Sequence, residues 1–116
     1  MEELTLEKFK EAAKKVKEVT AGTPLIHSDF FSSMCGNEIY LKPENMQFTG
    51  AYKLRGAYYK ISTMTDEERK KGLITASAGN HAQGVAYAAS KLRQQWLCLL
   101  THLLSRLTEQ RDMAQK

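Results

Sequence analysis

The segment Leu73-Ile74-Thr75-Ala76-Ser77-Ala78-Gly79-Asn80-His81-Ala82-Gln83-Gly84 decides the fold that we expect for this chain. Residues 73–76 are a short, largely apolar run and are predicted to form a strand. Residues 80–92 are rich in alanine, a strong helix former, and are expected to form the helix that follows. A strand, a glycine-containing turn and a helix in this order make a βα unit. The sequence therefore predicts an α/β fold with parallel strands.

An amphipathic helix is expected over residues 5–19, because apolar side chains recur there at helical spacing. They are Leu6, Phe9, Ala12, Ala13, Val16 and Val19. The segment Ala21-Gly22-Thr23-Pro24 ends this helix, since glycine and proline both disfavour its continuation. Residues 38–42 alternate between apolar and polar side chains, and we expect them to form a strand that ends before Pro43.

Residues 53–64 are also predicted to be helical. The next stretch, Thr65-Asp66-Glu67-Glu68, has the spacing of a capping box. In such a box the Thr65 hydroxyl and the Glu68 carboxylate each accept a hydrogen bond from a backbone amide at the start of a helix. A helix is therefore expected to begin directly after Thr65.

The turn between the predicted strand and helix suits an anionic ligand. Ser77 and Asn80 can cap the helix, and Gly79 lets the backbone approach a ligand closely. The free amides and the positive end of the helix dipole favour a carboxylate or a phosphate. An ordinary capped turn without a ligand would have the same residues, so both interpretations stay open on this segment alone.

Lys53 is the second candidate functional residue, and it lies between Gly50 and Gly56. A lysine can hold an aldehyde cofactor as a Schiff base if its amine loses its proton at neutral pH, which requires a desolvated or cationic surrounding. Arg55 is nearby in sequence, but most lysines are simply solvated. The pattern allows a Schiff-base lysine beside an anion site.

Composition argues against several other classes of protein. The chain has 116 residues, 42% of them hydrophobic, with a formal net charge of +4. This length suits one domain, and the dispersed basic residues do not indicate a nucleic-acid partner. Cys35 and Cys98 are too few for a disulfide framework, and no His/Cys cluster suggests a metal. The N-terminal residues lack the layout of a secretory signal, and no apolar run reaches a membrane span. A cytoplasmic protein without a membrane partner is expected.

The chain resembles the threonine dehydratases (threonine ammonia-lyases) in its motifs. These motifs are Thr23-Pro24-Leu25, the run from Lys42 to Ala57, and the run from Ser77 to Gly84. The resemblance implies an N-terminal fragment of the type II, tryptophan synthase β-like, fold of pyridoxal-phosphate enzymes. That fold would be an incomplete parallel sheet with flanking helices over residues 1–92. Cysteine synthases carry Asp where this chain has Leu54, and serine racemases carry a second serine where it has Ala78.

The resemblance also implies roles for individual residues. Lys53 would hold pyridoxal 5'-phosphate and remove the proton from the substrate Cα, and Asn80 would hydrogen-bond the phenolic oxygen of the cofactor. The substrate carboxylate would lie against Ser77, Ala78, Gly79, Asn80 and His81. His81 has two open interpretations, a chemical role or packing alone. The reaction would convert L-threonine to 2-oxobutanoate and ammonia, and full-length relatives would be homo-oligomers. A relative acting on serine, as racemase or dehydratase, is the alternative.

Residues 93–116 depart from the family pattern. Leucines at positions 97, 100, 103, 104 and 107 would form an amphipathic helix, and a short non-catalytic protein that binds a partner through this Leu-rich tail is a further alternative. A shifted reading frame joins the third base of each codon to the first two bases of the next. In that frame, however, residues 93–116 can be back-translated as ATVVMPTHTPALKIDRTKGHGAK, which matches the family continuation. The codons of Met113-Ala114 can then give only Gly. We therefore expect an out-of-frame tail, and a truncated chain without dehydratase activity.

Overall fold

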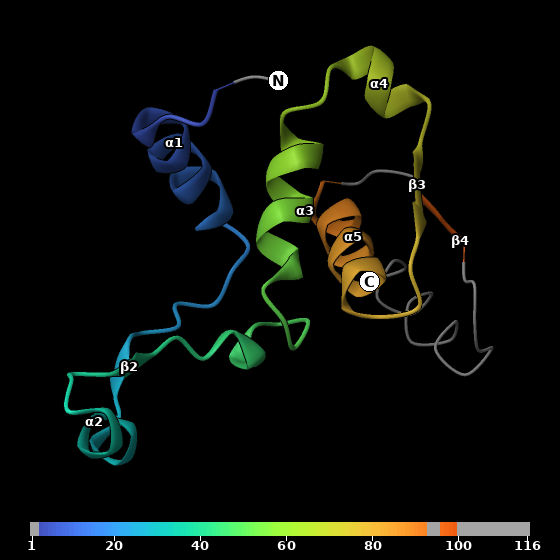
Figure 1. The fold of residues 1–116 in the computed structure, drawn as a ribbon. Coiled ribbons are helices and arrows are strands. Elements are labelled where there is room, and N and C mark those ends of the chain that lie inside the picture. Colours follow the sequence, from blue (N-terminus) through green and yellow to red (C-terminus); the bar gives the residue numbers. More distant parts are fainter. Residues whose placement is uncertain (1–2, 93–95, 100–116) are drawn as a thin grey trace.

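The computed structural model describes residues 3–92 and 96–99 of the chain (Figure 1). Its helices and strands follow in the order α1 (Leu6–Val16), β1 (Ile26–His27), α2 (Asp29–Cys35), β2 (Tyr40–Leu41), the 3₁₀ helix η1 (Glu44–Met46), α3 (Lys53–Ser62), α4 (Asp66–Lys70), β3 (Leu73–Ala76), α5 (Asn80–Lys91) and β4 (Trp96–Leu99). Within the described residues, no helix is long and apolar enough to cross a membrane.

Helix α1 begins where the sequence predicts and ends earlier. The hydroxyl of Thr5 accepts a hydrogen bond from the backbone N–H of Lys8 and caps the helix. The regular helix ends at Val16, so the expected extension to residue 19 is wrong. Thr20 bonds its hydroxyl to the carbonyl of Val16, and the chain turns there. Val16 and Val19 are buried against α3, whereas Leu6 and Phe9 on the same helix are exposed.

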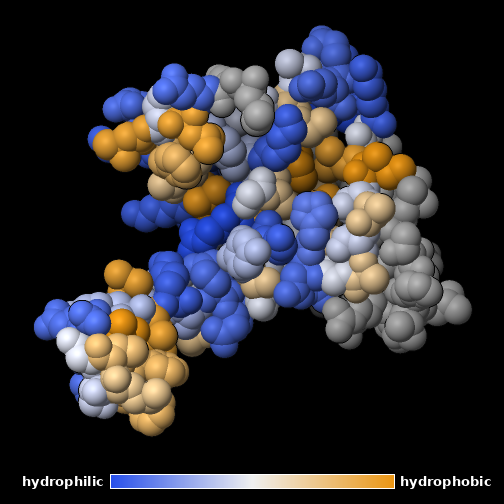
Figure 2. Space-filling view, in the orientation of Figure 1, coloured by the Kyte–Doolittle hydropathy of each residue, from blue (hydrophilic) through white to orange (hydrophobic). Residues whose placement is uncertain are grey.

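Strands β1 and β2 and helix α2 form a small lobe beside the main body (Figure 1). The strands are antiparallel, with Ile26 opposite Leu41 and His27 opposite Tyr40. The strand expected over 38–42 is therefore shorter, because its partner β1 is itself short. Figure 2 shows apolar residues gathered on this lobe, and the exposed side chains include Phe30, Met34 and Tyr40.

The βα unit predicted from the sequence is present. Strand β3 covers Leu73–Ala76, and α5 follows from Asn80 to Lys91. Strand β4 pairs with β3 in parallel, with Leu73 opposite Trp96 and Ala76 opposite Leu99. The capping box is also confirmed, since Thr65 and Glu68 bond each other's backbone amides at 3.2 and 2.8 Å and start α4.

The helical interpretation of the Leu-rich tail is wrong at residues 96–99, which form strand β4. Strand β3 offers backbone amides and carbonyls along its edge, and a parallel neighbour satisfies them where a helix would not. Residues 93–95 and 100–116, with the rest of the predicted tail, lie outside the described part of the chain.

The core lies between α3 and α5, which pack side by side (Figure 1). Small side chains of α5, such as Ala82 and Ala88, are fully buried and let the two backbones approach closely. Leu54 at the start of α3 is fully buried as well. The core thus includes the first turn of α3, which begins at Lys53.

Candidate functional site

Lys53 is the first residue of helix α3 and is half-buried. The chain reaches it through a tight turn in which the Gly50 N–H bonds the Gln47 carbonyl at 2.8 Å. Gly50 has a φ of 68°, a left-handed conformation that glycine adopts without strain. The Lys53 ammonium lies 4.9 Å from the centre of the Tyr52 ring. This places the amine against the face of an aromatic ring.

Buried polar side chains hold this turn in place. The Gln47 side chain accepts a hydrogen bond from the Ala21 N–H at 2.9 Å and donates one to the Ala21 carbonyl at 3.1 Å. Gln47 and Thr23 are both buried, and the Thr23 hydroxyl donates to the Glu44 carboxylate at 2.9 Å. The segment before Lys53 is therefore fixed to the stretch that follows α1.

Glu44 connects this network to α3. Its carboxylate accepts paired hydrogen bonds from the Arg55 guanidinium at 2.8 and 2.9 Å. These bonds lower the pKa of Glu44 to about 2, because the charged carboxylate is the form that they stabilise. Arg55 is thus engaged by Glu44, and its charge supports the turn before Lys53 instead of standing free beside the amine.

Acid should weaken the fold through Glu44. Its folded-state pKa is depressed from 4.5 to about 2, so its stabilisation is present above pH 4.5 and is lost as the pH falls toward 2. We expect the free energy of unfolding, measured by urea titration with circular dichroism, to fall across this window. The substitution Glu44→Gln should remove that part of the pH dependence. Glu38→Gln, at an exposed site, is the control and should leave it in place.

The second candidate segment, Ser77–His81, forms the turn between β3 and α5. The Ser77 hydroxyl accepts a hydrogen bond from the Gly79 N–H at 3.3 Å. Gly79 is the N-cap residue and Asn80 is the first residue of the helix. Capping of α5 by the Asn80 side chain is therefore a wrong prediction. With a glycine at the cap, the first amides of α5 lack a side-chain acceptor from that residue, and they suit an external anion.

Helix packing brings Lys53 and this turn together. Gly84 of α5 is buried, and a Cβ built on it would lie 3.0 Å from the carbonyl carbon of Lys53. Asn80 precedes Gly84 by one helical turn, about 6 Å along the axis. The Lys53 backbone therefore lies about one helical turn from the N-terminal end of α5. Sequence reasoning did not single out Gly84, although a glycine in the interior of a helix is a signal of close packing.

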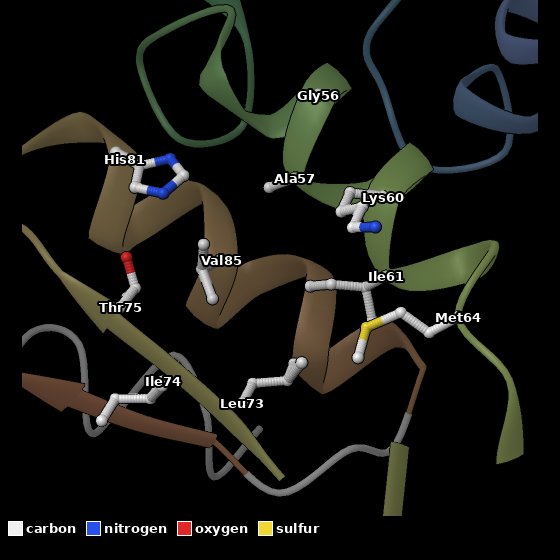
Figure 3. Close-up of a pocket in the computed structure, with 10 residues that line it drawn as sticks. All are labelled: Gly56, Ala57, Lys60, Ile61, Met64, Leu73, Ile74, Thr75, His81 and Val85. Atoms are coloured by element: carbon white, nitrogen blue, oxygen red, sulfur yellow. The ribbon is translucent and has the colours of Figure 1, made fainter. Parts of the chain in front are cut away.

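A separate cavity of about 300 Å³ lies between α3, α5 and β3 (Figure 3). Its lining is mostly apolar and includes Ile61, Leu73 and Val85. His81 lies at its edge, on the α3 side of the turn. Lys53 does not belong to the lining of this cavity. His81 is exposed, and both interpretations of it, a chemical role or packing alone, stay predictions.

A serine, a histidine and an aspartate also meet in the small lobe. His27 lies 3.1 Å from the Ser32 hydroxyl through one ring nitrogen and 3.1 Å from Asp29 through the other. A catalytic triad shields its carboxylate, whereas Asp29 is fully exposed. Ser32 also accepts a hydrogen bond from the Ile39 N–H at 2.9 Å. The cluster therefore ties α2 to the strands of the lobe. In the described chain no group of three or more His, Cys, Asp and Glu side chains could hold a metal ion.

Comparison with known proteins gives consistent matches. Residues 16–102 match the family described as "Pyridoxal-phosphate dependent enzyme". The "L-threonine ammonia-lyase" of Thermotoga maritima is 56% identical over 86 residues, which cover 74% of this chain and 21% of that protein. The chain thus spans about a fifth of the length of this relative. The family match continues to residue 102, past Leu92, after which the sequence departs from the family pattern.

Solved structures with the same fold include two plant enzymes. The structure of maize serine racemase is 29% identical in sequence, with a TM-score of 0.80, and the match covers 95% of this chain and 34% of that one. The processed form of threonine deaminase isoform 2 from Solanum lycopersicum is 32% identical, with a TM-score of 0.78, and 95% and 32% of the chains are covered. This chain therefore has the architecture of part of each.

Proposed function

Since the chain belongs to the family of pyridoxal-phosphate dependent enzymes, we propose that residues 1–92 are the N-terminal part of the catalytic region of an L-threonine ammonia-lyase. The fold is part of the type II fold of this family, as the resemblance implies, and pyridoxal phosphate is the family's cofactor. The observation that carries the proposal is the packing of Lys53 within one turn of the amide-rich end of α5.

The residues present fit this cofactor and an amino-acid substrate. Lys53 offers a half-buried primary amine, which can condense with the aldehyde of the cofactor and later take the proton from the substrate Cα. The amides of the turn over residues 77–81, with the Ser77 hydroxyl, can bind the substrate carboxylate. Asn80, at the start of α5, is proposed to hydrogen-bond the phenolic oxygen of the cofactor. Bound pyridoxal phosphate supplies the electron sink that makes the α-proton acidic.

Ala78 favours elimination over racemisation. Racemisation requires an acid that returns a proton to the face of the substrate opposite the lysine, and serine racemases resemble this chain but carry a serine at that place. A methyl group cannot donate a proton. L-threonine is the proposed substrate because the Thermotoga maritima relative is named for it, and 2-oxobutanoate and ammonia are the proposed products. A serine-specific relative is the second candidate because maize serine racemase shares the fold.

The chain alone is expected to be inactive, because it spans about a fifth of the length of a relative named for the activity. The test uses a chimera in which residues 1–92 replace the matching segment of the Thermotoga maritima protein. We expect the chimera to release 2-oxobutanoate from L-threonine, and the 116-residue chain to release none. Pyruvate from L-serine and the yield of D-serine are measured in parallel.

Each outcome decides a separate point. A chimera that folds and binds the cofactor, yet turns over neither amino acid, would contradict the proposed lyase function. A chimera that racemises serine faster than it eliminates water from threonine would replace the first candidate with the second. Turnover by the 116-residue chain on its own would refute the expectation that residues 1–92 need the rest of the catalytic region.

A further inference from the structure

Helices α3 and α5 approach each other most closely at Gly84. A Cβ added there would lie 3.0 Å from the carbonyl carbon of Lys53 and 3.1 Å from both the Lys53 oxygen and the Leu54 nitrogen. These atoms belong to the backbone, so they cannot move aside by changing a rotamer. Even the smallest side chain would push the start of α3 away from α5 by a few tenths of an ångström.

The glycine at this position is otherwise costly. Glycine in the interior of a helix is less stable than alanine by about 1 kcal/mol. Gly56 in α3 provides a direct comparison, because a Cβ built on it meets nothing within 4 Å. Each of the two glycines therefore lowers helix stability by a similar amount, and they differ in the atoms that surround them. Only at Gly84 does the missing side chain bring another element into contact, and that element starts with Lys53.

We propose that Gly84 is a positioning residue for Lys53. Its missing side chain fixes the spacing between the lysine and the anion-binding end of α5, so that one cofactor and its substrate can engage both. Lys53 begins α3, and a shift of the helix backbone moves its amine directly. This inference rests on the proposed function, because the spacing matters only if Lys53 and the turn serve one ligand.

The test measures Schiff-base formation on the full chain, without turnover. The Lys53 amine attacks the aldehyde of pyridoxal phosphate and water leaves, forming a C=N bond. Borohydride then adds hydride to the carbon, the nitrogen takes a proton from water, and the product is a stable secondary amine. Mass spectrometry of peptides gives the labelling rate at Lys53 relative to Lys60, an exposed lysine on the same helix.

We expect Gly84→Ala to lower the ratio of Lys53 to Lys60 labelling by on the order of tenfold, since a misplacement of about 1 Å can cost on the order of 10²-fold and the shift here is smaller. Gly56→Ala should leave this ratio unchanged. Helix content by circular dichroism is compared across the variants. An unchanged ratio in a folded Gly84→Ala chain would overturn the inference.

The unsubstituted chain separates this inference from the proposed function. A ratio near one in the chain before any substitution means that residues 1–92 do not activate Lys53 without the rest of the catalytic region, and the ratio is then measured in the chimera. A ratio near one in the chimera contradicts the proposed function before Gly84 is considered. Should Gly84→Ala not fold in the chain, the same pair of variants is compared in the chimera through kcat and KM for L-threonine. A fall in kcat in a folded chimera supports positioning. A chimera that also loses its helices shows that Gly84 serves folding as a whole and overturns the proposal.

Discussion

The substitution Lys53→Ala is expected to abolish lyase activity in the chimera while leaving its fold intact. The amine is the proposed attachment point of the cofactor and the proposed base for the Cα proton, and alanine can do neither. Loss of the proton transfer alone would lower kcat on the order of 10²–10⁴-fold, and loss of attachment would add to it. The measurement is 2-oxobutanoate release under saturating L-threonine, with borohydride trapping of the cofactor on the same samples.

Lys60→Ala is the matched control, because Lys60 is an exposed lysine on the same helix. It should keep activity within about twofold, since exposed substitutions of this kind usually change stability by no more than about 0.5 kcal/mol. Lys53→Arg keeps the positive charge but not the nucleophile, and it should be as inactive as alanine. Substantial turnover by either Lys53 variant would refute the assignment of this lysine.

Some helix starts in this chain follow from short-range rules and could be predicted. The capping box of Thr65 and Glu68 depends only on residues within one helical turn, and it forms as the spacing indicates. Strand β3 and helix α5 are likewise set by a local change from an apolar run to an alanine-rich run after a glycine. The prediction missed helix α2, whose start is marked by Ser28 as N-cap and whose end is marked by Gly36 in the left-handed conformation.

The arrangement of the candidate site could not be read from the same rules. Arg55 is close to Lys53 in the sequence, but tertiary contacts direct its guanidinium to Glu44, which lies across the preceding turn. Asn80 has the side chain of a helix cap, yet the turn geometry gives the cap position to Gly79. The contact between Gly84 and the Lys53 backbone joins segments far apart in sequence. Periodicity and propensity describe one element at a time, so they do not predict such contacts.

Leu54→Ala should be among the most destabilising single substitutions in the described chain. Leu54 is 0% exposed and packs in the core next to the lysine. Removing its side chain leaves a cavity between α3 and α5, and such changes cost about 2–5 kcal/mol. Small domains have about 5–15 kcal/mol in total. We expect the urea midpoint, followed by circular dichroism, to fall sharply or the chain to be unfolded without denaturant.

Leu25→Ala removes the same atoms from a side chain that is 65% exposed, and it should change the free energy of unfolding by less than about 0.5 kcal/mol. Equal losses for the two variants would mean that α3 and α5 do not form the core.

The position of Leu54 also links stability to chemistry. Leu54 anchors the first turn of α3 and directly follows Lys53 in the sequence. The same side chain therefore stabilises the core and the position of the lysine. A loss of Lys53 labelling in parallel with the loss of stability is therefore expected for Leu54→Ala. Gly84→Ala should separate the two effects.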